Sequence, residues 1–301
     1  MESITGFDQL IRQFSAPDNT CTVAVGCPDD EPTIETIGRC LKQTAVNFIL
    51  ITKGNPVDPA LTGNHRLTVV DTPDADAAAA KAVELVRGGQ ADVLMKGNIN
   101  TDNLLRAVLN KEHGLLPAGN VLTHIAVAEV PTYSKLLIFS DAAVIPRPTL
   151  DQFRAMITYD VEVSRKLGRT HTDVALIHFT EKVNPKFPHT LDYATLIEEA
   201  NRGDFGADVT VGGPMDVKTA CDAHSGDIKG ITSPVAGKAD VLIFPNLEAG
   251  NTFYKSVAFL AHGTIAGIIG GTSAPVVVPS RADSAESKFI SLALATLMAK
   301  K

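Results

Sequence analysis

Short apolar runs bounded by turn residues alternate with amphipathic segments along most of this 301-residue chain. In the first part of the chain, runs of strand length precede segments with helical periodicity, and this order predicts α/β structure with a mostly parallel sheet. The expected strands are 21–26, 46–51, 67–70 and 91–95, and the expected helices are 1–14, 33–41, 77–87 and 102–109.

The pattern changes near residues 114–119, where two strand-like runs follow each other without a helix. They are joined by Pro131-Thr132-Tyr133, which predicts a hairpin. Alternation then resumes, with expected helices at 149–167, 191–200 and 214–221 and expected strands at 174–178 and 208–212. We therefore expect two α/β domains, one formed by residues 1–118 with 267–301 and one, residues 119–266, inserted into it.

The stretch from Ala239 to Leu294 contains the sharpest functional signal. Its apolar runs, 241–244, 265–269 and 275–278, are typical of buried parallel strands. Ligands bind beyond the carboxyl ends of the strands in such a sheet. Residues 246–251 and 280–287 are therefore expected to lie at the ligand-binding edge.

Ser280 and Arg281 stand directly before the last expected helix. A neutral donor and a fixed cation beside a helix N-terminus suit an anion such as phosphate. The alternative is an exposed arginine in a capped turn. Asp283 with Glu286 resembles a capping pair, and Ser284 is a rival N-cap.

A second candidate anion site follows the strand that ends at Met95. It combines a lysine, a glycine that allows close backbone approach, polar side chains and a helix N-terminus. Asn100 or Thr101 is expected to cap that helix, and an ordinary capped turn is the alternative interpretation. The candidate residues are Lys96, Asn98, Asn100, Thr101 and Arg106.

The composition and charge of the chain exclude some kinds of binding partner. A formal net charge of −7 argues against nucleic acid or an anionic membrane as partner, although a basic cleft can still bind anionic substrates. No apolar run reaches transmembrane length, and the N-terminus lacks the features of a signal peptide. The four cysteines show no disulfide spacing, which fits a reducing cytoplasm.

Several catalytic motifs are absent from the sequence: the dinucleotide fingerprint, the phosphate-binding P-loop and the nucleophile elbow of hydrolases. No metal site is expected. Cys221 and His224 have no further cysteine or histidine beside them in the sequence. Asp204 and Asp208 lie in a loop that contains glycine, and they are more simply interpreted as polar residues that keep this loop in contact with solvent.

Several segments resemble the phosphate acetyl/butyryl transferases. The matching sequence segments are SPVAGKADVLIFPNLEAGN, from Ser233 to Asn251, and the Ser280-Arg281 pair before the last expected helix. NKEHGLLPAGNVLTHIAVAEVP and EKVNPK are similar to the butyryl branch more than to the acetyl branch, and FSDAAVIPRPTL matches an Asp-bearing strand end of the family. The likeness covers roughly residues 90–295.

The resemblance implies a reaction and a fold. The reaction is acyl-CoA plus phosphate giving acyl phosphate plus coenzyme A, with butyryl as the expected acyl group and phosphate acetyltransferase as the alternative. Coenzyme A is a substrate, and no prosthetic group is implied. The implied fold is similar to isocitrate and isopropylmalate dehydrogenases, with the active-site cleft between two domains, in a homodimer or higher homo-oligomer.

The resemblance also assigns roles to the two anion sites. Arg281 and Arg106 hold phosphate, Ser280 donates to the reacting carbonyl or the thiolate, and the side chains of the second site complete the phosphate pocket. The acetyl branch has an aspartate six residues after the motif arginine, where this chain has Ser287. Glu286 or Asp283 is then the candidate base, unless the thiol is activated otherwise.

Coenzyme A contacts are carried over onto Asn246, Gly250 and Asn251 by the same resemblance. Asp141, at an expected strand end, is a candidate to hold a ligand hydroxyl or to orient a basic residue, with turn capping as the alternative. Two rival functions from other classes are a metal- and NAD-dependent decarboxylating dehydrogenase and a non-catalytic coenzyme A-binding protein.

Overall fold

A computed structural model describes residues 3–280 and 283–299. Arg281 therefore lies outside the described residues. The chain divides into two compact units. The terminal unit comprises Phe7–Leu122 with Ala266–Lys301, and the central unit comprises Thr123–Ile265 with Met1–Gly6. Among the described residues, no helix has the length and apolarity needed to cross a membrane.

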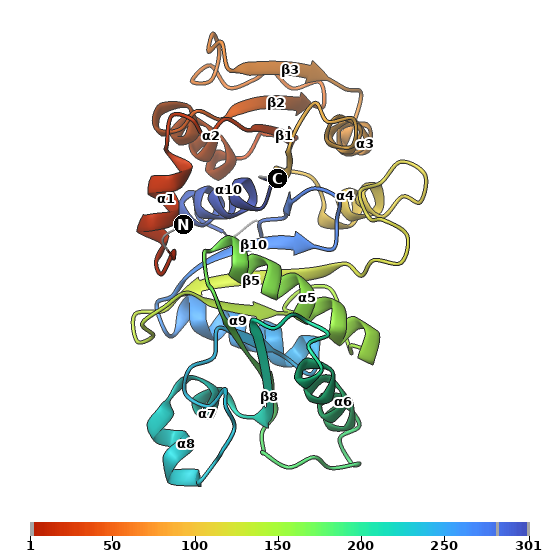
Figure 1. Ribbon diagram of the computed structural model, residues 1–301. Helices are drawn as coiled ribbons and strands as arrows, with labels where there is room; N and C mark the ends of the chain where they lie inside the picture. Colours follow the sequence, from red (N-terminus) through yellow and green to blue (C-terminus); the bar gives the residue numbers. More distant parts are fainter. Residues whose placement is uncertain (1–2, 281–282, 300–301) are drawn as a thin grey trace. The chain divides into compact units, whose positions relative to one another are not determined.

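The terminal unit is built on a mostly parallel run of strands in the order β3-β2-β1-β4-β11-β10 (Figure 1). In register, Gly26 of β1 is opposite Lys96 of β4, and Val277 of β11 is opposite Met95. The strands are β1 (Thr22–Gly26), β2 (Asn47–Thr52), β3 (Leu67–Asp71), β4 (Val93–Lys96), β10 (Thr264–Gly270) and β11 (Val276–Val277).

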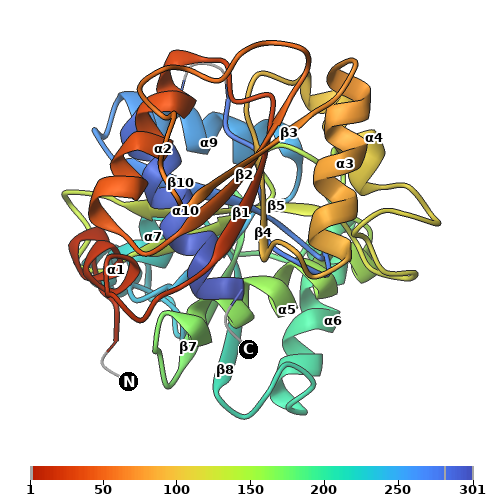
Figure 2. The same cartoon turned by 90° about the horizontal axis from the view of Figure 1, so that it is seen from above.

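Helices cover both faces of these strands. Figure 2 shows α3 and α4 on one side of β1, β2 and β4, and α1, α2 and α10 on the other. Asp30 and Asp74 begin α2 and α3 by accepting hydrogen bonds from backbone N–H groups of the first turn. The helices are α1 (Phe7–Phe14), α2 (Glu31–Gln43), α3 (Ala75–Arg87), α4 (Thr101–Val108) and α10 (Ala285–Ala299).

One strand pair departs from the parallel arrangement that the sequence predicts. β10 and β11 are antiparallel, with Ile269 opposite Val276, so the prediction of parallel strands is wrong for β10. Gly271, at φ 87°, reverses the chain between them. A connection this short permits a hairpin but not the crossover that parallel neighbours need.

The central unit has the strand order β5-β6-β9-β7-β8. β5 and β6 form the predicted antiparallel hairpin, with Val127 opposite Ile138, and the remaining pairs are parallel. The strands are β5 (Thr123–Glu129), β6 (Leu137–Ser140), β7 (Thr172–Ile177), β8 (Val209–Met215) and β9 (Val241–Ile243).

Alternate residues of these strands face different helices, as the pleat requires. Phe139 and Leu242 lie in a core cluster with residues of α9, and the Phe139 ring meets Phe253 edge-on at 5.1 Å. The helices of this unit are α5 (Leu150–Lys166), α6 (His189–Asn201), α7 (Val217–Cys221), α8 (Ala223–Lys229) and α9 (Leu247–Phe259). The sequence did not predict α8. Asp222, the residue between the two helices, ends α7 and caps the N-terminus of α8.

Candidate active site

Three loops of the terminal unit meet at one edge of its parallel strands. They follow β1, β4 and β11, which are neighbours in the sheet and point the same way. The backbone N–H of Asn98 donates to the carbonyl oxygen of Cys27 at 2.7 Å, and that of Gly97 donates to Gly26 at 2.9 Å. Ser280 and the second candidate anion site, far apart in sequence, therefore follow neighbouring strands at the same edge.

Gly97 is the residue that permits the loops to approach. A Cβ atom at this position would lie 2.3 Å from the carbonyl oxygen of Cys27, closer than real Cβ contacts come. The close backbone approach expected at this glycine is therefore to the loop after β1. Cys27 is itself buried, with φ at 52°, and its burial raises the pKa of its thiol to about 11.

Lys96 lies beneath this edge rather than on it. The side chain is buried, and its ammonium group donates to the carbonyl oxygens of Gly97 and Ile99 at 3.1 and 3.2 Å. A buried ammonium with backbone acceptors stiffens the turn and adds positive charge behind it.

The start of α4 presents polar groups to solvent. Asn98 and Asn100 are exposed, and Asn100 occupies the N-cap position without a capping hydrogen bond from its side chain. Thr101 is the first residue of the helix. Arg106 is exposed and makes no hydrogen bond or ion pair with another described residue. An open helix N-terminus suits an anion, and Arg106 adds an unpaired guanidinium in the last turn of the same helix.

The loop before α10 is held by Asp283. Its Oδ2 accepts a hydrogen bond from the backbone N–H of Ser280 at 2.8 Å, and its own N–H donates to the Ser280 carbonyl oxygen at 3.1 Å. Ser284 caps α10, because its Oγ accepts from the N–H of Ser287 at 3.2 Å. The structure thus has Ser284 as the N-cap of α10, the alternative to the Asp283–Glu286 capping pair.

Glu286 pairs with a residue that the sequence did not single out. Its carboxylate forms an ion pair with Arg39 of α2, whose guanidinium also lies 3.8 Å from the centre of the Phe289 ring. Glu286 is therefore tied to the side of α2, whereas Asp283 is tied to Ser280.

Lys288 was also missed by the sequence interpretation. This buried ammonium lies 2.7 Å from Asp30 Oδ1 and 2.9 Å from Thr33 Oγ1. Burial alone would raise the pKa of Asp30, but the hydrogen bonds from Lys288 and Thr33 outweigh it and lower that pKa. The only sequence signal was a lysine among the apolar residues of the last helix.

Asp141 belongs to the central unit, where it organises the loop after β6. Its Oδ2 accepts from Thr123 Oγ1 at 2.6 Å and from the N–H of His124 at 2.8 Å. Its Oδ1 accepts from the N–H groups of Ala143 and Val144 at 2.7 and 2.8 Å. With four donors on a buried carboxylate, the structure favours the turn-capping alternative over contact with a ligand hydroxyl.

The start of α9 docks on this Asp141 loop. Asn246 caps the helix through Oδ1 and the N–H of Ala249 at 2.9 Å, and Asn251 Nδ2 donates to the Ala142 carbonyl oxygen at 2.9 Å. A Cβ atom on Gly250 would lie 2.0 Å from the carbonyl oxygen of Asp141. The structure therefore brings Asp141 and the three predicted coenzyme A contacts together, Asn246 and Asn251 through side-chain hydrogen bonds to the backbone and Gly250 through its close backbone approach.

A second carboxyl group lies behind the Asp141 loop. Asp160 of α5 is fully buried and accepts a hydrogen bond from Ser140 Oγ through Oδ2, while its Oδ1 has no hydrogen-bond partner among the described residues. Burial raises the pKa of Asp160 well above its usual range, and the neighbouring charge of Asp141 adds to this. Burial therefore favours the protonated, neutral form of Asp160.

Two histidines that the sequence did not single out meet between β7 and α6: His178 follows β7, and His189 is the first residue of α6. His178 Nδ1 and His189 Nε2 lie 3.1 Å apart, and burial lowers the pKa of both rings. Elsewhere, Asp204 and Asp208 pair with Arg202 and Arg165. Over residues 3–280 and 283–299, no group of three or more His, Cys, Asp or Glu side chains is arranged to hold a metal ion.

Comparison with known proteins identifies relatives along almost the whole chain. The family model described as phosphate acetyl/butaryl transferase matches residues 67–296. The phosphate butyryltransferase of Clostridium acetobutylicum is 38% identical over 300 residues, which cover 98% of this chain and 99% of that protein. The phosphate acetyltransferase of Rhizobium meliloti is 34% identical over 98% of this chain and 94% of that protein.

A solved structure gives the same result. The crystal structure of a branched-chain phosphotransacylase from Enterococcus faecalis V583 superposes with a TM-score of 0.84 at 32% identity. The match covers 93% of this chain and 99% of that one. The fold of the present chain is therefore that of the phosphotransacylases.

Proposed function

The chain belongs to the phosphate acetyl/butaryl transferase family, and we propose that it acts on butyryl or branched short-chain thioesters. The family and the activity predicted from the sequence are confirmed: the enzyme moves an acyl group between coenzyme A and inorganic phosphate. The choice of acyl group is supported by similarity to a phosphate butyryltransferase and a branched-chain phosphotransacylase. Phosphate acetyltransferase is the alternative.

The reaction makes defined demands on the site. A phosphate oxygen attacks the thioester carbonyl carbon, the carbonyl oxygen becomes negative, and the C–S bond then breaks to release the thiolate. The thiolate takes up a proton to give coenzyme A, and the carbonyl forms again in the acyl phosphate. Catalysis thus requires a phosphate-binding group, a donor at the developing oxyanion and a group that handles the thiol proton.

The observation that carries the assignment of residues is the adjacency of the loops after β4 and β11. We assign phosphate to the open N-terminus of α4, with Asn98, Asn100 and Thr101 as neutral donors. Arg106 supplies a guanidinium that has no partner among the described residues. Arg281 is assigned a second phosphate contact on the sequence alone. Lys96 contributes charge from behind the loop and touches the turn rather than the substrate.

Ser280 and Asp283 carry the acyl side of the proposal. Ser280 is exposed at the end of the β11 loop and donates through its hydroxyl to the carbonyl oxygen or the thiolate. Asp283 is favoured over Glu286 as the group that exchanges the thiol proton, because Asp283 contacts Ser280 whereas Glu286 is held by Arg39.

The start of α9 is assigned to coenzyme A. Asn246, Gly250 and Asn251 fix this helix on the Asp141 loop, so we propose that they position it, with the exposed Asn251 as the direct contact. We further propose that the enzyme works in the cytoplasm, as a homodimer or higher homo-oligomer and without a prosthetic group. Its four free cysteines fit a reducing compartment. A similarity of fold to isocitrate and isopropylmalate dehydrogenases stays a prediction.

The test is thiol release from acyl-CoA, followed with a thiol reagent in the presence and absence of phosphate. Butyryl-CoA, isobutyryl-CoA and acetyl-CoA are compared by kcat/KM. We expect phosphate-dependent release that is fastest with a four-carbon acyl group, because each methylene in a fitting pocket contributes about 1–3 kcal/mol. A preference for acetyl-CoA would assign the alternative specificity.

Two variants test the assigned residues separately from the activity. Ser280→Ala is expected to lower kcat by roughly 10²-fold or more, the scale of losing one oxyanion donor. Glu286→Gln is expected to retain most of the activity, whereas Asp283→Asn loses it. The reverse order would make Glu286 the base. Tight coenzyme A binding without turnover in the unmodified enzyme would support the binding-protein alternative.

A further inference from the structure

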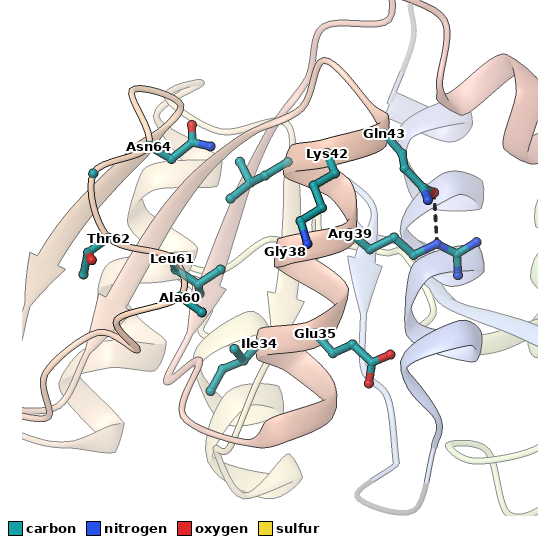
Figure 3. A pocket seen from close by; sticks show the side chains of 12 residues that line it. Ile34, Glu35, Gly38, Arg39, Lys42, Gln43, Ala60, Leu61, Thr62 and Asn64 are labelled. Atoms are coloured by element: carbon teal, nitrogen blue, oxygen red, sulfur yellow. Dashed lines mark hydrogen bonds between the residues drawn. The ribbon is translucent and has the colours of Figure 1, made fainter.

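A groove of about 710 Å³ runs along α2 in the terminal unit (Figure 3). One wall is the exposed side of α2, and the other is the loop that connects β2 to β3. This groove contains none of the residues assigned to acyl transfer. It is lined by Ile34, Glu35, Gly38, Arg39, Leu41, Lys42, Gln43, Ala60, Leu61, Thr62, Gly63 and Asn64.

The middle of the α2 wall is a glycine that packing does not require. A Cβ atom on Gly38 would meet only Leu61 Cδ2, at 3.9 Å, which is ordinary van der Waals contact. Glycine in a helix interior nevertheless costs about 0.5–1 kcal/mol relative to alanine. The missing side chain leaves the groove open, lined at this level by the partly exposed Ile34 and the buried Leu61.

The charges around the groove are unevenly distributed. Arg39 points away from the 60–64 loop, where it pairs with Glu286 and donates through Nε to Gln43 at 3.1 Å (Figure 3). Glu35 also points away from that loop in Figure 3. Lys42 lies one turn after Gly38 on the same side of α2 and has no hydrogen-bond or ion-pair partner among the described residues.

We propose that this groove binds a small amphipathic anion, a carboxylate or phosphate monoester with a short apolar chain. The apolar chain lies over Gly38 beside Ile34, and the anionic head meets Lys42. Thr62 and Asn64 supply neutral polar groups on the opposite wall. The volume lies within the range of about 300–1,000 Å³ typical of small-molecule sites. The site is independent of the acyl-transfer reaction.

Binding to the full-length protein would be measured by saturation-transfer NMR and calorimetry. Coenzyme A and phosphate are kept in excess so that the acyl-transfer site is occupied. The probes are hexanoate, hexyl phosphate and 1-hexanol, which share one apolar chain and differ in the head group. We expect at least one anion to bind more tightly than the alcohol, and the tighter anion identifies the head group. Equal binding of all three would overturn the assignment of an anionic ligand.

Variants locate the binding site. Lys42→Gln is expected to weaken the anion by roughly twofold to fivefold, the range of an exposed charge pair. Gly38→Leu should abolish binding by filling the groove, while Gly38→Ala should retain it. Lys111→Gln is the matched control, an exposed lysine elsewhere in the terminal unit, and should bind as the unmodified protein does. Unchanged affinity in both Lys42→Gln and Gly38→Leu, or no anion binding at millimolar concentration, would overturn the proposal.

Discussion

The buried Lys288 and the partly buried Asp30 form an ion pair that joins α10 to the start of α2, with 2.7 Å between Nζ and Oδ1. Lys288 lies in the first turn of the helix that follows the Ser280 loop, and Asp30 caps the helix that follows the β1 loop. Two of the three loops at the candidate phosphate edge are therefore anchored to each other by one contact.

Replacing Lys288 with methionine should destabilise the protein. The change leaves the carboxylate of Asp30 partly buried without its ammonium partner, and we expect a loss of about 2–4 kcal/mol in the free energy of unfolding by urea. Because the pKa of Asp30 is lowered in the folded protein, this stabilisation is present above about pH 4 and is lost as the pH falls through the folded pKa.

Lys81→Met is the control for that experiment. Lys81 forms an ion pair with Glu84 at the same 2.7 Å, but on the exposed surface of α3. An exposed pair is screened by solvent, so its loss should change the free energy of unfolding by no more than about 1 kcal/mol. Equal effects of the two substitutions would contradict a special role for the Lys288–Asp30 pair.

Arg106→Ala should act on phosphate alone. Removing a charge-assisted contact to an oxyanion costs about 1.5–3 kcal/mol, so KM for phosphate is expected to rise roughly tenfold or more. KM for the acyl-CoA substrate should remain within about twofold, since the proposal assigns no coenzyme A contact to this residue. Steady-state kinetics with each substrate varied in turn would decide this, and a selective rise in KM for acyl-CoA would place Arg106 at the other substrate.

Gly250 and Gly38 should respond in opposite directions to alanine. Both lie inside helices, but a Cβ atom meets the Asp141 carbonyl oxygen at 2.0 Å in the first case and only Leu61 Cδ2 at 3.9 Å in the second. We expect Gly250→Ala to lower the melting temperature by several degrees, because α9 must move away from the Asp141 loop. Gly38→Ala should raise it slightly through helix propensity. A stable Gly250→Ala variant would show that α9 does not need this close approach.

Asp160→Asn should change how stability depends on pH. The pKa of Asp160 is higher in the folded protein than in the unfolded chain, which releases this proton above about pH 4. The free energy of unfolding therefore falls as the pH rises from about 4 toward the folded pKa of Asp160. Asparagine cannot ionise and still accepts from Ser140. The variant should therefore gain stability relative to the unmodified protein as the pH rises above about 4 in urea unfolding. Parallel pH profiles would mean that Asp160 is ionised in the folded state.

The sequence by itself determined the elements and the family. Apolar periodicity located the strand that ends at Lys96 and the helix that follows it, the hairpin at Pro131-Thr132-Tyr133 and the helix after Ser280, because these signals arise from neighbouring residues. The words around Asn246 and Ser280 identified the transferase family, which the comparisons confirmed.

Only the tertiary structure decided which of these residues meet and which are already occupied. The neighbours of β4 are β1 and β11, and nothing local in the sequence states this, because strand order is set by packing across the whole sheet. In the same way, Glu286 meets Arg39 and Lys288 meets Asp30 across more than two hundred residues. A side chain at a strand end is available to a ligand only if distant parts of the chain leave it unpaired, and that depends on contacts formed when the chain folds.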